Sequence, residues 1–165
     1  MAITVDKIDA AVEAAVFAPE EEARQQYRRD IWALAASLGI YPASIQGLYD
    51  AAGKGLYHNK TVPAMNLRGM TYQVSRAVFR AVLKNKVGAF VFEIARSEIG
   101  YTKQSPGEYT ACVLAAAVKE GFKGPVFIQG DHYQVNAARH GTDPDKELGA
   151  IEALIKESVD AGFLN

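Results

Sequence analysis

The sequence has few of the features that mark a disulfide-bonded, membrane or nucleic-acid-binding protein. Its one cysteine, Cys112, excludes an internal disulfide, and the apolar neighbours of this residue favour a small buried side chain over a nucleophile. Its 18 basic and 19 acidic residues leave a formal net charge of -1, so no global field attracts nucleic acid or an anionic membrane. Any anionic ligand must therefore be held by local groups.

Long apolar runs are also missing. No stretch approaches the roughly 20 apolar residues that a membrane helix needs. The first residues reach Asp6 without the basic start and apolar core of a signal peptide. With 49% hydrophobic and 22% charged residues, the composition is that of a soluble globular protein, and the expected location is the cytoplasm.

The N-terminal segment, residues 1–58, is predicted to be helical. Apolar residues recur at helical spacing between Asp6 and Ala18, and Pro19 then opens a second helix that is rich in early acidic residues and ends at Gly39. A third, shorter helix is expected over residues 42–52, followed by a polar connector.

From residue 59 to residue 165, short apolar runs alternate with helical segments. Strands are expected over residues 62–67, 87–94 and 125–130, and helices over residues 72–84, 105–120 and 143–160. The last two strand runs are apolar throughout, which is typical of parallel strands covered on both faces. The alternation predicts right-handed βαβ units and an α/β fold, with a fourth strand starting at residues 163–165.

Polar residues follow each predicted strand, where parallel α/β folds gather their reactive groups. These residues are Asn66 and Arg68 after the first strand, Glu93, Arg96, Ser97 and Glu98 at the second, and Gln129, Asp131, His132 and Asn136 at the third.

The adjacent pair Asp131 and His132 suits metal chemistry. Neutral imidazole is a common zinc ligand, and a carboxylate beside the metal can move a proton. The alternative is a loop pair that caps the next turn. Glu93, a carboxylate at the end of an apolar strand, needs a partner or a metal; its alternative is an ion pair with Arg68 or Arg96.

These motifs resemble a known family. The segments Phe92-Glu93-Ile94-Ala95, Gly100-Tyr101-Thr102 and Gln129-Gly130-Asp131-His132, with Asn136, are similar to the tagatose-bisphosphate aldolase accessory-subunit family. Met65-Asn66, Asp131-His132 and Ala161-Gly162-Phe163 resemble the related class II fructose-bisphosphate aldolases. The resemblance covers roughly residues 60–165. It departs at Gln129, where the fructose-bisphosphate aldolases often carry a histidine.

The resemblance implies a fold and a chemistry. The fold would be the helical N-terminal segment followed by the first three βα units of a truncated TIM-type (β/α)8 barrel. The function would be that of a class II-type aldolase, a lyase that acts on a ketose phosphate or bisphosphate with a divalent metal, usually zinc.

In this interpretation Asp131 is the acid/base group, His132 is a metal ligand, and Asn66, Glu93, Ser97 and Asn136 bind substrate. Further metal ligands and a phosphate loop would belong to later strands. The expected partner is a sugar phosphate, together with a second copy of the chain or a partner aldolase subunit. Two alternatives stay open, namely a non-catalytic accessory subunit of a tagatose-bisphosphate aldolase and a metal-dependent sugar epimerase on the same scaffold.

Overall fold

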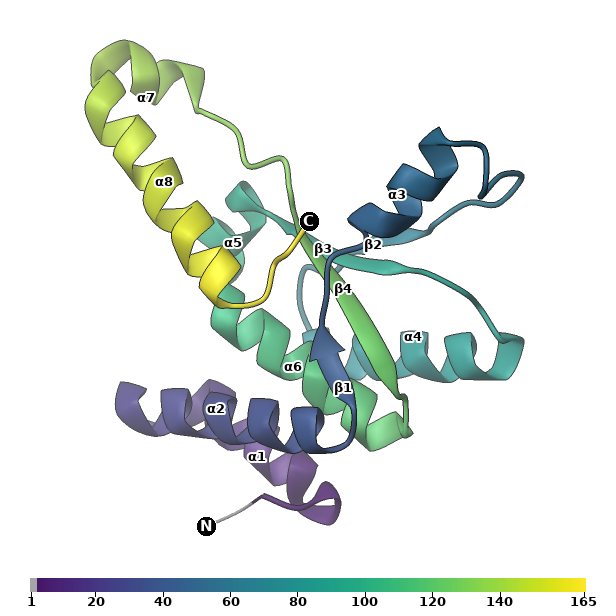
Figure 1. The fold of residues 1–165 in the computed structure, drawn as a ribbon. Coiled ribbons are helices and arrows are strands. Elements are labelled where there is room, and N and C mark those ends of the chain that lie inside the picture. Colours follow the sequence, from purple (N-terminus) through teal and green to yellow (C-terminus); the bar gives the residue numbers. More distant parts are fainter. Residues whose placement is uncertain (1–2) are drawn as a thin grey trace.

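The computed structural model describes residues 3–165 and shows a four-stranded parallel sheet with helices packed against it (Figure 1). The strand order is β1-β4-β3-β2. In chain order the elements are η1 Val5–Lys7, α1 Ile8–Phe17, α2 Glu21–Ser37, β1 Ile40–Pro42, α3 Gln46–Gly53, β2 Ala64–Asn66, α4 Thr71–Asn85, β3 Val91–Ala95, α5 Arg96–Thr102, α6 Pro106–Glu120, β4 Gly124–Asp131, α7 Ala137–Thr142 and α8 Pro144–Asp160. None of the helices in the described part of the chain is both long and apolar enough to cross a membrane.

The two longest helices of the C-terminal half begin where the sequence predicts. The Ser105 hydroxyl caps α6 by accepting a hydrogen bond from the Glu108 N–H at 3.3 Å, and a proline follows the cap. Asp143 caps α8 in the same way, accepting from the Lys146 N–H at 3.1 Å. The sequence alone predicts these two helix starts because each cap joins residues only three positions apart.

The hydrophobic core lies between one face of the sheet and helices α4 and α6. Side chains alternate along a strand, and Phe92, Ile94 and Ile128 point to this face and are fully buried. Phe92 packs against Phe79 of α4, with ring centroids 5.3 Å apart. Helices α1 and α2 pack on the outer side of α6. Cys112 lies inside α6 and is buried, which confirms its expected position; this burial raises the pKa of its thiol to about 12.

The sequence predicts a helical N-terminal segment, but the structure shows a strand within it. Residues Ile40–Pro42 form β1, which pairs in parallel with β4, so the predicted helix start at Pro42 is wrong. Gly39, at φ +76°, ends the preceding helix, and its carbonyl accepts a hydrogen bond from the Gly124 N–H at 2.9 Å. A proline is tolerated here because β1 is an edge strand. The segment before residue 59 therefore contributes a strand to the same sheet as β2, β3 and β4.

The chain end lies beside β4, on the same edge as β1. The Leu164 N–H donates to the Ile128 carbonyl at 3.2 Å, and the Asn165 amide nitrogen reaches the same carbonyl at 3.3 Å. Gly162, at φ +84°, permits this return from α8, and a Cβ there would lie 2.9 Å from Pro42 and Trp32. Residues 163–165 form no strand in the structure, although the sequence predicts a fourth strand there; Leu164 makes a single main-chain hydrogen bond to β4.

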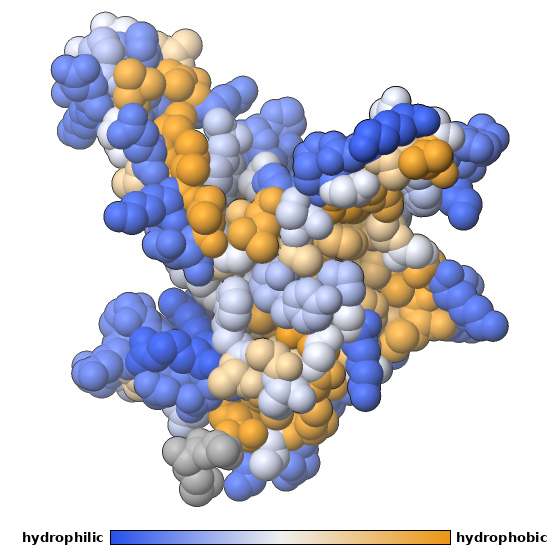
Figure 2. All heavy atoms as spheres, in the orientation of Figure 1, coloured by the Kyte–Doolittle hydropathy of each residue, from blue (hydrophilic) through white to orange (hydrophobic). Residues whose placement is uncertain are grey.

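One side of α8 is apolar and exposed. Its successive exposed apolar residues lie seven and four positions apart, which places them on one side of a helix. Figure 2 shows an apolar band along this helix. They are Leu148, Ile155 and Val159. No other element among residues 3–165 covers them, and aligned apolar residues of this kind are typical of a surface that packs against further protein.

Two buried hydroxyls provide a test of this core. Ser75 Oγ is buried without a hydrogen-bond partner among residues 3–165, whereas the buried Thr110 hydroxyl donates to the Ala161 carbonyl at 2.7 Å. We expect Ser75→Ala to leave the free energy of unfolding unchanged or to raise it by up to about 1 kcal/mol, because an unpaired buried hydroxyl is costly. Thr110→Val should lower it by about 1–3 kcal/mol. Urea unfolding of both variants measures the contrast, and equal losses would contradict the hydrogen-bond assignment.

Candidate functional site

The predicted site residues of the strands lie on one face of the sheet, at its carboxyl edge. Asn66, Glu93 and Gln129 occupy the same register position on β2, β3 and β4, so their side chains share a face. Asp131, two residues beyond Gln129, points to this face too. The predicted common rim for Asn66, Glu93 and Asp131 is therefore confirmed. This face is opposite to the one that packs on α4 and α6, and its polar side chains are partly exposed.

A hydrogen bond joins the first and last of these residues across the middle strand. The Asn66 amide nitrogen donates to Asp131 Oδ2 at 2.8 Å. Ala95 of β3 pairs with Asp131 and lies between the two, and its single methyl group leaves room for the contact. Asn66 Oδ1 is buried and accepts no hydrogen bond within the described chain, so the Asn66 amide contributes only its N–H group to the contacts at this edge.

Glu93 is held by an amide and not by a cation. Its Oε2 accepts a hydrogen bond from the Gln129 side chain at 2.6 Å. The alternative ion pairs expected from the sequence are absent, because Arg68 binds Glu98 and Arg96 binds Glu147. Behind the strand, the Tyr109 hydroxyl donates to the Glu93 carbonyl at 2.8 Å; burial raises the pKa of this tyrosine, which keeps it a neutral donor. Within residues 3–165 the Glu93 carboxylate thus faces the rim without a paired positive charge.

Glu98 is a third carboxylate at the rim; the sequence places it after the second strand but assigns it no role. Its Oε2 accepts from the Ala95 N–H at 2.8 Å, and Oε1 pairs with Arg68. Burial acts to raise the pKa of Glu98, but these hydrogen bonds outweigh it and the pKa lies below its ordinary value. Its position as the third residue of α5, where a glutamate side chain binds the main-chain N–H before the helix, is the local sequence pattern that marks it.

His132 leaves the strand end toward solvent. Its backbone is in the left-handed region at φ +49°, its side chain is mostly exposed, and Nε2 lies 3.2 Å from Asp131 Oδ1. The ring of the next residue, Tyr133, packs over Gly130, where a Cβ atom would lie only 2.8 Å from it. The Tyr133 hydroxyl forms a hydrogen bond with the Ser158 hydroxyl of α8. The sharp turn after Asp131 is therefore anchored to α8.

The described residues do not complete a zinc site. Catalytic zinc takes three protein ligands, and residues 3–165 hold no group of three His, Cys, Asp or Glu side chains placed for a metal. His132 is the one imidazole at the rim, since the strands carry no other histidine. We therefore derive no step through a metal from these residues.

Ser97 and Asn136 lie beside the rim cluster, not in it. Both line a groove of about 680 Å³ between α5 and the segment that joins β4 to α7. Ser97 is exposed at the start of α5. The Asn136 side chain caps α7, with Oδ1 accepting from the Arg139 N–H at 3.0 Å. Its observed role is thus to start the helix that borders the groove.

An ion pair fixes this groove to α8. The Arg96 guanidinium donates to both oxygens of the buried Glu147 carboxylate, at 2.5 and 3.2 Å, and also to the Gln134 carbonyl at 3.0 Å. Glu147 further accepts from the Asn136 N–H at 2.8 Å. The hydrogen bond from Arg96 lowers the pKa of Glu147 to about 2. Sequence reasoning missed Glu147, because its partner lies 51 residues away.

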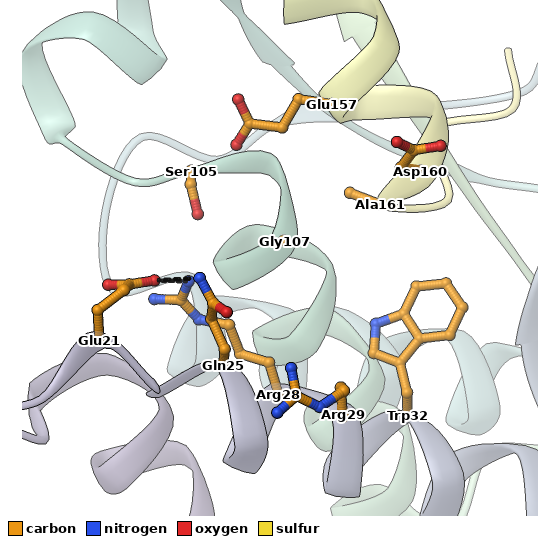
Figure 3. A pocket seen from close by; sticks show the side chains of 10 residues that line it. All are labelled: Glu21, Gln25, Arg28, Arg29, Trp32, Ser105, Gly107, Glu157, Asp160 and Ala161. Atoms are coloured by element: carbon orange, nitrogen blue, oxygen red, sulfur yellow. Dashed lines mark hydrogen bonds and ion pairs between the residues drawn. The ribbon is translucent and has the colours of Figure 1, made fainter. Parts of the chain in front are cut away.

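A larger hollow, of about 800 Å³, lies between α2, the start of α6 and the end of α8 (Figure 3). Arg28 and Arg29 approach it from α2, and Glu157 and Asp160 approach it from α8. Arg28 is paired with Glu108 at 3.0 Å. The cleft shares no lining residue with the rim, and its charges are of both signs, so it indicates no particular ligand.

Comparison with protein-family models, with curated proteins and with solved structures gave no match to this chain. Its site is therefore interpreted from its own geometry.

The Arg96–Glu147 pair predicts a pH dependence of stability. A carboxyl whose pKa is about 2 in the folded state and 4.5 ordinarily stabilises the fold above pH 4.5, and loses that contribution as the pH falls toward 2. We expect Glu147→Gln to unfold more easily at pH 7, with a difference from the native chain that narrows below pH 4.5.

Thermal unfolding between pH 7 and pH 3 measures this difference. The matched control is Glu152→Gln on the same helix, an exposed carboxylate with no ion pair among residues 3–165. A pH profile of Glu147→Gln that runs parallel to the native profile would show that the carboxylate carries no such linkage.

Proposed function

We propose that the chain is the N-terminal part of a class II-type aldolase, a lyase that cleaves or forms a carbon–carbon bond in a ketose phosphate or bisphosphate. The observation that supports this best is the hydrogen bond from Asn66 to Asp131. It brings residues of two different strands together at the carboxyl edge, where parallel α/β enzymes carry their reactive groups.

Asp131 is suited to act as the acid/base group. Its carboxylate is partly exposed, the Asn66 amide binds Oδ2, and Oδ1 lies 3.2 Å from His132 Nε2, so both oxygens are held in defined positions. Aldol cleavage removes a proton from a hydroxyl, and a positioned carboxylate can accept it. Asn66, which lies partly exposed on the same face, is proposed to bind substrate beside Asp131.

The proposal includes a divalent metal such as zinc, which when bound would polarise the ketose carbonyl. Of the described residues, His132 is the one proposed as a ligand, through its exposed imidazole. Further ligands would come from beyond these strands. Glu93, held by Gln129 on the same face, is proposed to bind substrate hydroxyls.

Two features support a partial TIM-type barrel. Strands β2, β3 and β4 are adjacent, parallel and in sequence order, as successive barrel strands are. The apolar band on α8 has the character of a helix face that packs against the next helix of such a barrel. The polar face of the sheet would then line the interior mouth.

This proposal predicts different effects for two neighbouring residues. In a protein that carries this chain with its remaining strands, Asp131→Asn should reduce turnover by about 10²–10⁴-fold and leave the metal content unchanged, because Asp131 moves a proton and is not a ligand. His132→Ala should lose metal and turnover together.

Metal analysis and a coupled assay of triose phosphate release measure both effects. His140→Ala, an exposed histidine on α7, is the control and should behave as the native protein. Full metal content in His132→Ala would overturn the ligand assignment. Native protein that never cleaves the sugar but stabilises a separate aldolase would instead be an accessory subunit, and an inverted hydroxyl in the product would identify an epimerase.

A further inference from the structure

The groove beside the rim is lined by basic side chains and by no acidic ones. Its lining includes three side chains that are always positive, Arg96, Lys103 and Arg139, together with His132, and it includes no aspartate or glutamate. The protein as a whole has a formal net charge of -1, so this groove is a local positive site in a nearly neutral molecule.

Most of this charge is uncompensated. Arg96 is neutralised by Glu147, which lies outside the lining. Neither Lys103 nor Arg139 forms an ion pair with any residue between 3 and 165. Both side chains line the same groove, and an anion bound there would interact favourably with each of them.

The walls of the groove are held together by side-chain hydrogen bonds and an ion pair. Lys103 follows the last residue of α5, and Arg139 lies on α7. The Arg96–Glu147 pair, with the bonds to Gln134 and Asn136, holds these two walls together. The Tyr101 ring, 62% exposed, adds an apolar surface to the same lining. A volume of about 680 Å³ is ample for a phosphorylated sugar.

We propose that this groove binds the phosphate group of the substrate, with Lys103 and Arg139 as its cationic ligands. The assignment rests on the proposed function, because it names the place of the phosphate relative to the reacting end. His132 belongs to both the groove and the rim, so a substrate anchored by its phosphate in the groove extends its carbon chain past His132 toward Asp131. The Tyr101 ring then packs on the sugar carbons.

The test is a titration of the 165-residue chain with fructose 1,6-bisphosphate and, separately, with inorganic phosphate. Calorimetry gives the affinities, and amide chemical shifts locate the ligand. The test variant is Lys103→Ala/Arg139→Ala. The control is Lys54→Ala/Lys123→Ala, which also removes two positive charges from exposed positions outside the groove. A third variant, Lys103→Arg/Arg139→Lys, keeps the charges in place.

The test variant should bind fructose 1,6-bisphosphate at least about tenfold more weakly, since charge-assisted hydrogen bonds are lost. The control should change by less than about twofold, and the charge-keeping variant should retain most of the affinity. Shifts should concentrate at residues 97–103 and 132–139. An unchanged affinity in the test variant, an equal loss in the control, or no binding by the native chain would each overturn the proposal.

The two ligands separate this assignment from the proposed function. If inorganic phosphate binds in the groove and the sugar bisphosphate binds no better, the anion site stands and the ketose substrate is wrong. If the bisphosphate shifts the amides near Asp131 and the test variant binds it normally, the groove is wrong and the substrate class stands.

Discussion

Helix α6 is the constraint on which the rest of the structure depends. Most of its residues are fully buried, because the sheet and α4 cover one side and α1, α2 and α8 cover the other. Its alanines, including Ala115 and Ala116, allow neighbouring elements to approach closely on several sides. A helix apolar all around must lie inside a protein, so its position decides where the layers on both sides go. The polar face of the sheet is the side that α6 leaves free.

At that free face, side-chain amides bind two of the three carboxylates, and an arginine pairs with the third. Asp131 accepts from an asparagine amide, Glu93 from a glutamine amide, and Glu98 from a main-chain N–H and an arginine. The amide partners add no charge, so Asp131 and Glu93 keep their negative charges available to the rim. Arg68 neutralises only Glu98, at its edge. The acidic side chains of the rim and the basic side chains of the groove thus lie in separate places along one edge of the sheet.

The buried pair of Arg96 and Glu147 connects these two regions. It ties the start of α5 and the segment after β4 to α8, and this segment carries His132. A bidentate arginine–carboxylate pair has a defined geometry, so it holds the groove walls more firmly than single contacts would. The Arg96–Glu147 pair thus fixes the position of the segment that follows β4.

The sequence by itself determined the α/β class, the strands β2, β3 and β4, the helices capped by Ser105 and Asp143, and the gathering of Asn66, Glu93 and Asp131 at one edge. These features depend on residues that lie close together in the chain: helix caps, apolar runs and the polar residues that follow strands. They can therefore be predicted from the sequence. Only the tertiary structure decided that Ile40–Pro42 pairs with β4, that Gln129 is the partner of Glu93, and that Arg96 reaches Glu147. Such partners are far apart in the chain, and any of several arginines or amides satisfies a carboxylate equally well until packing brings one of them within reach.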